Sequence, residues 1–222
     1  MSDKYWLMGP VYDALSFVFA GNSILNCKKS MLTSEYLKPG DKVLFAGVGH
    51  GKEAIYAAEL GAEVTVVDLS RAMLTKFEEG IKKSGKSLNI KIKHSDILTV
   101  DDFGEYDMVV ANFFLNVFSE PFMAEVLAHL IKLGKKDAYI VVGDFALPEG
   151  NPLAWLFKQA YWYLAIIIFW VTTGAALHPV YDYQAHMIRK GLNMLSKKHT
   201  KVLGINAYTA LLGRKVAPTT NS

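Results

Sequence analysis

The sequence has little cysteine and, in its last third, almost no acid. Its one thiol, Cys27, cannot form an intramolecular disulfide or supply a cysteine-based metal site, and it suits a reducing compartment. Charged residues make up only 20% of the chain and hydrophobic residues 51%, which excludes an intrinsically disordered protein. The amino-terminal residues lack a basic stretch followed by a continuous apolar run, so no signal peptide is expected. These absences favour a folded cytoplasmic protein.

The shortage of acid divides the chain into two parts. Residues 1–150 contain 16 Lys and Arg against 20 Asp and Glu, whereas residues 151–222 contain 8 against Asp182 alone. The two parts therefore carry formal charges of −4 and +7, which the overall charge of +3 conceals. A chain of 222 residues fits a single domain. We expect one domain with two different surfaces.

Short apolar segments alternate with helical patterns between residues 42 and 143. Strands that alternate with helices of about ten to fifteen residues indicate βαβ units and a mainly parallel sheet, whose ligand site lies at the carboxyl ends of the strands. The expected strands are 42–46, 64–67, 88–93, 107–111 and 138–143, and the expected helices are 52–60, 70–82 and 120–133.

The two ends of the chain extend this pattern. Residues 11–37 suggest two short helices before the breaker Pro39-Gly40, and strands at 202–205 and 208–212 form a closing pair. The predicted fold is α/β: a Rossmann-like, seven-stranded, mostly parallel sheet with an antiparallel closing strand. Its parts are a helical cap (1–40), a cofactor-binding core (41–150), an apolar and basic helical insertion (151–200) and closing strands (201–216).

A glycine loop follows the first expected strand. Gly47, Gly49 and Gly51 allow a sharp turn and close approach of a ligand to the start of the next helix. Asp68 ends the second strand, 21 positions after Gly47, where a carboxylate can accept both hydroxyls of a ribose. A ligand-free turn and a helix cap are the plainer readings. Together, the loop and the acid point to an adenosine-containing cofactor.

Five segments in order resemble class I S-adenosylmethionine-dependent methyltransferases. The third glycine falls one residue earlier than in the dinucleotide fingerprint, and the segments are 43–51, 66–70, 94–97, 106–112 and 130–136. Tyr12-Asp13 resembles a pair in the ubiquinone and menaquinone C-methyltransferases and related lipid methyltransferases. The resemblance implies S-adenosylmethionine as cofactor.

The resemblance also implies roles for individual residues. The three glycines would border the methionine half of the cofactor, Asp68 would hold the ribose, and Leu69 would pack on the adenine. Asp96 would accept a hydrogen bond from the adenine amino group, with Ile97 beside the ring. A simple loop cap is the plainer reading of Asp96.

The end of the fourth strand and the start of the glycine loop complete the implied site. Asn112 and Phe113 would face the sulfonium and the acceptor, although Asn112 also suits an ordinary strand-end hydrogen bond. The family usually has an acid two positions before the first glycine, where this chain has Phe45. Either Asn112 with backbone carbonyls, or His50, or Glu53 holds the cofactor's ammonium, or the cofactor is held differently. This departure keeps open a rhodoquinone-type enzyme that uses the cofactor as amino donor, and a non-catalytic cofactor-binding protein.

Residues 160–177 contain no charge, which meets the lower length limit for a transmembrane helix. A span would separate residues 200–215 from their sheet, so we expect an interfacial helix or the wall of a lipophilic pocket. Nearby Trp, Tyr and Lys residues favour peripheral contact with a membrane. A buried core helix with a solvated basic face, or a homodimer interface, is the alternative. So long an uncharged segment argues against nucleic acid.

Proton removal from an acceptor requires a base. His178, with Asp182 four residues later, is the first candidate, and Tyr12 is the second. Helix capping by the His–Asp pair and helix packing by Tyr12 are the plainer readings. The predicted function is methyl transfer from S-adenosylmethionine to a hydrophobic small molecule or lipid at a membrane surface, quinone-like acceptors first and aminophospholipids second.

Overall fold

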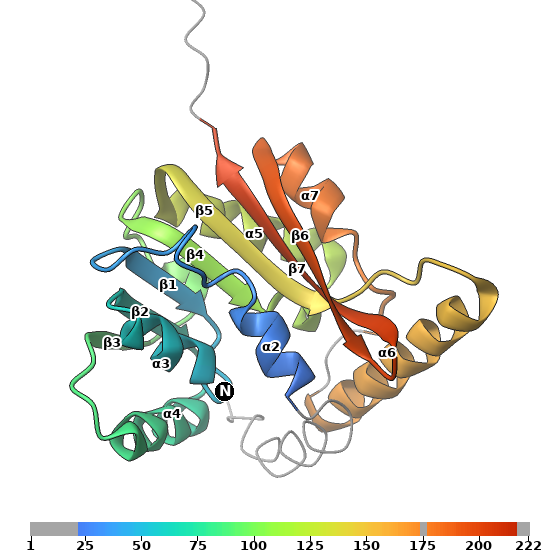
Figure 1. Ribbon diagram of the computed structural model, residues 1–222, viewed down its shortest axis with the longest axis horizontal. Helices are drawn as coiled ribbons and strands as arrows, with labels where there is room; N and C mark the ends of the chain where they lie inside the picture. The colour runs from blue at the N-terminus through green and yellow to red at the C-terminus, as the bar shows by residue number, and fades with distance from the viewer. Residues whose placement is uncertain (1–21, 174–176, 217–222) are drawn as a thin grey trace, which may run out of the picture.

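The computed structural model describes residues 22–173 and 177–216 and shows one sheet covered by helices (Figure 1). The seven strands have the order β3-β2-β1-β4-β5-β7-β6. Pairings among β1 to β5 are parallel, whereas β7 runs antiparallel to both β5 and β6. The predicted mostly parallel sheet with an antiparallel closing strand is confirmed.

The elements follow one another with short connections. The strands are β1 (Lys42–Ala46), β2 (Glu63–Asp68), β3 (Ile90–His94), β4 (Tyr106–Asn112), β5 (Gly134–Phe145), β6 (Leu192–Val202) and β7 (Ile205–Lys215). The helices are α2 (Ser23–Lys29), α3 (Lys52–Glu59), α4 (Arg71–Ser84), α5 (Glu120–Leu133), α6 (Pro152–Thr173) and α7 (Tyr183–Arg189), with short 3-10 turns η2 (Ile97–Thr99) and η3 (Leu115–Val117).

Two apolar clusters hold the helices against the two faces of the sheet. One joins Met31, Phe45 and Phe77 with the inner faces of α2, α3 and α4. The other joins Leu127 of α5 and Met187 of α7, which lie behind the sheet in Figure 1. Because both faces of the central strands β1 and β4 are buried, these strands contain nearly continuous apolar runs in the sequence. The cores fix the strand ends that carry the polar residues described below.

The last two strands differ from the prediction. β6 begins at Leu192 rather than at residue 202, so residues 192–200 are strand and not part of a helical insertion. β6 is the outer strand of the sheet, and its Lys197, Lys198 and His199 interrupt the apolar pattern. Charged side chains on an edge strand discourage pairing with another chain, and they hide such a strand from a hydrophobicity pattern. The apolar helix α6 ends before this hairpin.

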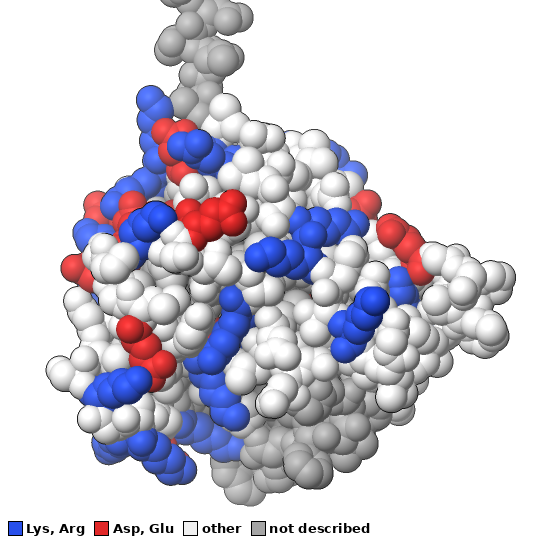
Figure 2. Space-filling view, viewed as in Figure 1, with Lys and Arg blue, Asp and Glu red and all other residues white. Residues whose placement is uncertain are grey.

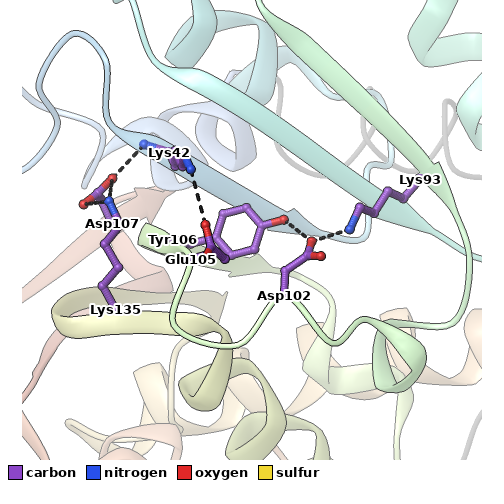
Figure 3. A network of polar contacts seen from close by, with 7 residues as sticks. All are labelled: Lys42, Lys93, Asp102, Glu105, Tyr106, Asp107 and Lys135. Atoms are coloured by element: carbon purple, nitrogen blue, oxygen red, sulfur yellow. Dashed lines mark hydrogen bonds and ion pairs between the residues drawn. The ribbon is translucent and has the colours of Figure 1, made fainter.

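A polar network lies where β1, β4 and β5 begin (Figure 3). Asp107 accepts the Lys42 backbone N–H at 2.9 Å and the Lys135 ammonium at 2.7 Å. In the adjoining loop, Asp102 accepts hydrogen bonds from Lys93 and from the Tyr106 hydroxyl. Hydrogen bonds from Lys93 and Tyr106 lower the pKa of Asp102. The Lys42, Asp107 and Lys135 contacts lie at the amino ends of their strands, opposite the candidate site.

Candidate cofactor and acceptor site

The glycine loop connects β1 to α3 in a left-handed backbone conformation. Gly47, Gly49 and Gly51 have φ of 74°, 48° and 62°, which side chains other than glycine rarely adopt. A Cβ on Gly51 would also overlap the Phe77 ring. Gly51 is the N-cap of α3 and offers no side chain there, so the N–H groups of the first turn stay available. The loop therefore has the shape that the sequence predicted.

Asp68 ends β2 beside this loop. Its Oδ2 accepts the Val48 N–H and its Oδ1 accepts the Ser70 N–H, both at 2.8 Å. The carboxylate thereby joins the glycine loop to the start of α4. Leu69 lies next to it with 60% of its surface exposed. An exposed leucine at this edge suits the predicted contact with a flat ring.

The residues after β3 are expected to form either a loop cap or a contact with the adenine ring. Asp96 caps η2, and its Oδ1 accepts the Leu98 N–H at 2.9 Å. This is the simple loop cap, yet the side chain is exposed and can accept further hydrogen bonds. Ile97 is buried in the core instead of lying open beside a ligand. The adenine contact of these two residues stays a prediction.

The end of β4 carries a buried amide with an orphaned acceptor. Asn112 donates from Nδ2 to the carbonyl oxygen of Lys28 at 3.1 Å. Within the described residues its Oδ1 is buried and has no hydrogen-bond partner. Phe113, the next residue, has a φ of 52°, and its ring meets those of Phe145 and Tyr208 edge to face. Phe113, an aromatic residue with a strained backbone, therefore lies between the edge of the sheet where the cofactor would bind and the end of β5.

A buried ion pair lies beside the phenylalanine that replaces the usual acid. Phe45 is packed in the core, 2% exposed. The Lys28 ammonium lies 2.9 Å from Oε1 of Glu53, in the first turn of α3, and their side chains are 7% and 4% exposed. The Lys28 ammonium also lies 5.8 Å from the centre of the Phe113 ring. The chain therefore places a carboxylate on the helix next to the glycine loop rather than on the strand before it.

The predicted His178 and Asp182 pair does not take the arrangement expected of a base and its orienting acid. His178 directs Nδ1 to the Pro179 carbonyl at 2.7 Å and Nε2 to the Asn116 carbonyl at 2.9 Å. Asp182 accepts the Ala185 N–H at 2.9 Å and caps α7. Both nitrogens of the imidazole therefore face backbone oxygens, and the acid serves a helix. Tyr12 lies outside the described residues.

The sequence reasoning missed a buried acid at the end of β5. Asp144 is 2% exposed, and its Oδ1 accepts hydrogen bonds from Nδ2 of Asn116 at 2.9 Å and from the Phe145 N–H at 2.8 Å. Its Oδ2 is buried without a hydrogen-bond partner that meets normal geometry among the described residues. Burial raises the pKa of Asp144 to about 7, although hydrogen bonds from Phe145, Tyr183 and Asn116 act to lower it. The only feature of the sequence that could have indicated Asp144 was the presence of an acidic residue within an apolar strand.

Comparison with known sequences identifies the segment that carries the glycine loop. Residues 43–137 match the family model described as "Methyltransferase domain". A ribosomal protein L11 methyltransferase from Staphylococcus carnosus is 24% identical over 184 residues, which are 82% of this chain and 46% of the relative. One from Thermotoga neapolitana is 39% identical over 79 residues, 35% of this chain and 29% of the relative. The chain thus spans less than half the length of these curated relatives, which are not quinone or lipid methyltransferases.

Solved structures show the same fold. The magnesium protoporphyrin IX methyltransferase from Synechocystis, solved with bound S-adenosylmethionine, has a TM-score of 0.64 at 16% identity, over 86% of this chain and 79% of that one. A methyltransferase dependent on the same cofactor from Aquifex aeolicus has a TM-score of 0.63 at 16% identity, over 92% and 98%. The chain therefore has the fold of the S-adenosylmethionine-dependent methyltransferases.

Proposed function

We propose that this chain, which has the methyltransferase fold and a methyltransferase domain over residues 43–137, is an S-adenosylmethionine-dependent methyltransferase that acts on a hydrophobic acceptor. The observation that carries the proposal is the glycine loop joined to Asp68, because the carboxylate shapes that loop through the Val48 N–H. The bound cofactor would supply a methyl group activated on sulfonium. In-line displacement then needs mainly positioning and exclusion of water.

The residues present fit this cofactor. A left-handed glycine loop leaves room for close approach, the Asp68 carboxylate lies beside that loop at the ribose position, and Leu69 offers an exposed apolar surface. The orphaned Oδ1 of Asn112 is an acceptor without a donor at the same edge of the sheet. A buried acceptor of this kind costs free energy unless it is satisfied, so a ligand donor nearby would stabilise it.

Lys28 and Glu53 would take the part of the acid that Phe45 replaces. The methionine end of the cofactor carries one ammonium and one carboxylate, and the buried pair offers one carboxylate and one ammonium 2.9 Å apart. Charge-assisted hydrogen bonds to both ends are stronger than neutral ones. Of the candidates that the sequence left open, Glu53 is therefore the one that we assign to the cofactor's ammonium.

The proposed acceptor is hydrophobic and quinone-like first. Phe113, Phe145, Tyr161 and Tyr208 meet ring to ring, and the hydroxyls of Tyr161 and Tyr208 lie 2.5 Å apart. These rings pack against one another as an aromatic cluster next to the end of β4, and small-molecule sites are typically lined by apolar and aromatic side chains with a few polar groups. Protein methylation, as the names of the curated relatives suggest, is the second candidate. The match to the relative from Thermotoga neapolitana covers 35% of the chain, which is too little to identify the acceptor.

We further propose that α6 rests on a membrane surface. Trp162 and Ile166 pack inward against Val180, while other positions of α6 expose apolar side chains. The exposed ones are Leu153, Trp155, Leu156, Tyr163, Leu164 and Ile167. Figure 2 shows a largely uncharged surface over α6 with lysines beside it. No helix of the described residues is long and apolar enough to span a bilayer.

Calorimetry with S-adenosylhomocysteine tests the cofactor site. Asp68→Ala should abolish binding, while Asp101→Ala, at an exposed loop position, should bind as the wild type does. Equal affinity in the two variants would refute the assignment of Asp68. Transfer of labelled methyl groups to a quinol, to aminophospholipid vesicles or to ribosomal proteins then separates the acceptor classes. Label on ribosomal protein alone would refute the hydrophobic acceptor.

Vesicle co-sedimentation tests the membrane proposal. Ile167→Lys combined with Leu164→Lys places two cations on the exposed side of α6 and should weaken binding to anionic vesicles only if that side lies on nonpolar lipid. Ile188→Lys is the matched control, because Ile188 is a helical isoleucine on α7 with 53% exposure against 46% for Ile167. Equal sedimentation of the two variants would overturn the proposal.

A further inference from the structure

A pocket of about 270 Å³ lies beyond the end of β5, between the closing hairpin and the starts of α6 and α7. Its walls combine apolar and polar side chains from five segments. The residues that define it are Phe145, Tyr181, Tyr183, Lys197, His199 and Thr209. Small-molecule sites typically measure about 300–1,000 Å³, so this pocket suits a single substituted ring rather than a larger polycyclic molecule.

The charges around the pocket balance. Lys158 and Lys197 oppose Glu149 and Asp182 in its lining. Lys158 is occupied with the carbonyls of Leu147 and Glu149, at 3.1 Å and 2.8 Å. Burial lowers the pKa of His199, and the two lysines lower it further, which favours a neutral imidazole. A lining without net charge, with aromatic rings in its walls, favours a neutral aromatic ligand over an anion such as a phosphate.

Asp144 does not itself line this pocket, but it shares a face of the sheet with two residues that do. It pairs with Thr209 across β5 and β7, and Thr209 pairs with His199 across β7 and β6. Side chains of directly paired residues point to the same face of a sheet, so the carboxyl shares the face of the two pocket residues. His199 directs Nδ1 to the Thr209 hydroxyl at 2.9 Å. Tyr183, which lines the pocket, interacts with the Asp144 carboxyl by hydrogen bonding.

The pocket also adjoins the edge where the cofactor would bind. Phe145 is one of the residues that line the pocket, and its ring meets the Phe113 ring at 5.8 Å between centroids. Asn116, in η3 after β4, holds Oδ1 of Asp144 in place. Asp144 is therefore linked through Asn116 to the end of β4 and through Tyr183 to the lining of a ring-sized pocket.

We propose that this pocket holds the aromatic ring of the methyl acceptor, a phenol or hydroquinone, and that Asp144 takes the proton of its ring hydroxyl, directly or through the Tyr183 hydroxyl. This inference rests on the proposed function. In the step, an oxygen lone pair of the acceptor forms the new bond to the methyl carbon as the carbon–sulfur bond breaks. The hydroxyl proton passes to the Asp144 carboxylate, and the products are an aryl methyl ether and neutral S-adenosylhomocysteine.

Several other titratable groups surround this carboxyl and must be considered in any pH experiment. They are Tyr183, His199, Lys158, Lys197 and Glu149 at the pocket, and Cys27 on α2, whose pKa Asp144 also affects. A titration assigned to Asp144 must therefore be absent from the Asp144→Asn variant.

The test uses 4-methylcatechol, which keeps its hydroxyl protons near neutral pH, and 4-nitrocatechol, which ionises more readily. Binding to the full chain is measured with S-adenosylhomocysteine present, for the wild type, Asp144→Asn and Asp101→Asn. We expect Asp144→Asn to bind 4-methylcatechol about tenfold or more weakly, since a hydrogen bond to a charged group is lost. In turnover, the variant should lose more activity with 4-methylcatechol than with 4-nitrocatechol, because the ionised ring needs no base.

A second measurement is independent of whether the variant folds. The carbon-13 signal of the Asp144 carboxyl in the wild type should titrate at a different pH once 4-methylcatechol is bound. Equal catechol binding by the wild type and Asp144→Asn, or an unchanged titration, would overturn the inference while cofactor binding and the proposed function stand. Failure of the wild type to bind S-adenosylhomocysteine would instead refute the proposed function. If the ratio of activity with 4-methylcatechol to activity with 4-nitrocatechol is the same in the wild type and in Asp144→Asn, proton transfer to Asp144 is refuted.

Discussion

Replacing Asp144 with Asn should change the pH dependence of stability in a defined direction. Burial raises the pKa of Asp144 from an ordinary 3.8 to about 7 in the folded protein. Between these two values the folded state holds a proton that the unfolded state releases. Stability from this group is therefore complete below about pH 4 and is lost as the pH rises toward 7. Asn cannot ionise, so the variant should not show this loss.

The size of the effect follows from the shift. A difference of about 3 pH units at 1.36 kcal/mol each gives an upper value of about 4 kcal/mol. Relaxation around the ionised carboxyl reduces this, and we expect about 2–4 kcal/mol. The protonated acid and the amide are similar in size and polarity, so this difference should be absent below about pH 4. At pH 5, about 1.2 units above the unfolded value of 3.8, about 1.6 kcal/mol of the upper value should already separate the two proteins, and by pH 8 the variant should have gained the full amount relative to the wild type.

Urea unfolding at half-unit intervals from pH 5 to pH 8 measures the difference. Asp102→Asn is the control, because Lys93 and Tyr106 lower the pKa of Asp102 below its ordinary 3.8, so its difference from the wild type should stay constant from pH 5 to pH 8. The contribution of Asp102 is present above its unfolded pKa and lost as the pH falls through its folded value. A difference between wild type and Asp144→Asn that stays constant from pH 5 to pH 8 would show that the buried carboxyl does not titrate there.

Three further predictions concern other parts of the site. Gly51→Ala should lower the melting temperature and abolish S-adenosylhomocysteine binding, because position 51 has a φ of 62° and an added Cβ would overlap the Phe77 ring. Gly40→Ala is the control: nothing lies within 4 Å of its added Cβ, so it should introduce only backbone strain and leave binding unchanged. Lys28→Met should destabilise the fold by about 3–5 kcal/mol in urea because it leaves the Glu53 carboxylate buried and unpaired; adding Glu53→Leu should recover much of this loss. Burial raises the pKa of Cys27 to about 12, so iodoacetamide at pH 8 should label it only after unfolding, and labelling of the native chain at the rate of a free thiol would contradict this.

Those parts of the fold that local patterns encode could be predicted. Residues 42–46 and 120–133 form the expected strand and helix with the same bounds, because their apolar periodicity agrees with their burial. β6 could not be predicted over its full length, because an edge strand buries only part of each side chain and tolerates Lys197 and Lys198. Only its pairing with β7 in the structure reveals the full length of this strand, which its composition does not indicate.

The same distinction applies to the candidate site. The glycine loop and Asp68 could be read from one stretch of sequence, since a strand, a tight turn and a helix follow one another directly. His178 and Asp182 are four residues apart, which suggests contact on a helix, yet α7 begins only at Tyr183 and Asp182 serves as its cap. Asp144 was missed because its environment comes from η3, α7 and β7, which the sheet topology brings together.

The phenylalanine at position 45 illustrates how a site can keep a function while losing the residue that usually performs it. A buried carboxylate is stable only if a cation accompanies it, so Glu53 can replace the strand acid only because Lys28 reaches it from α2. This pair carries the same two charges as the amino-acid end of the proposed cofactor, in complementary order. When the cofactor binds, its ammonium would pair with Glu53 and its carboxylate with Lys28. The single ion pair between Lys28 and Glu53 would thus be replaced by two, and neither side chain need be exposed to water. The identity of residue 45 alone is thus a weak reason to expect loss of cofactor binding, and the 2.9 Å contact between α2 and α3 is a stronger reason to expect that it is retained.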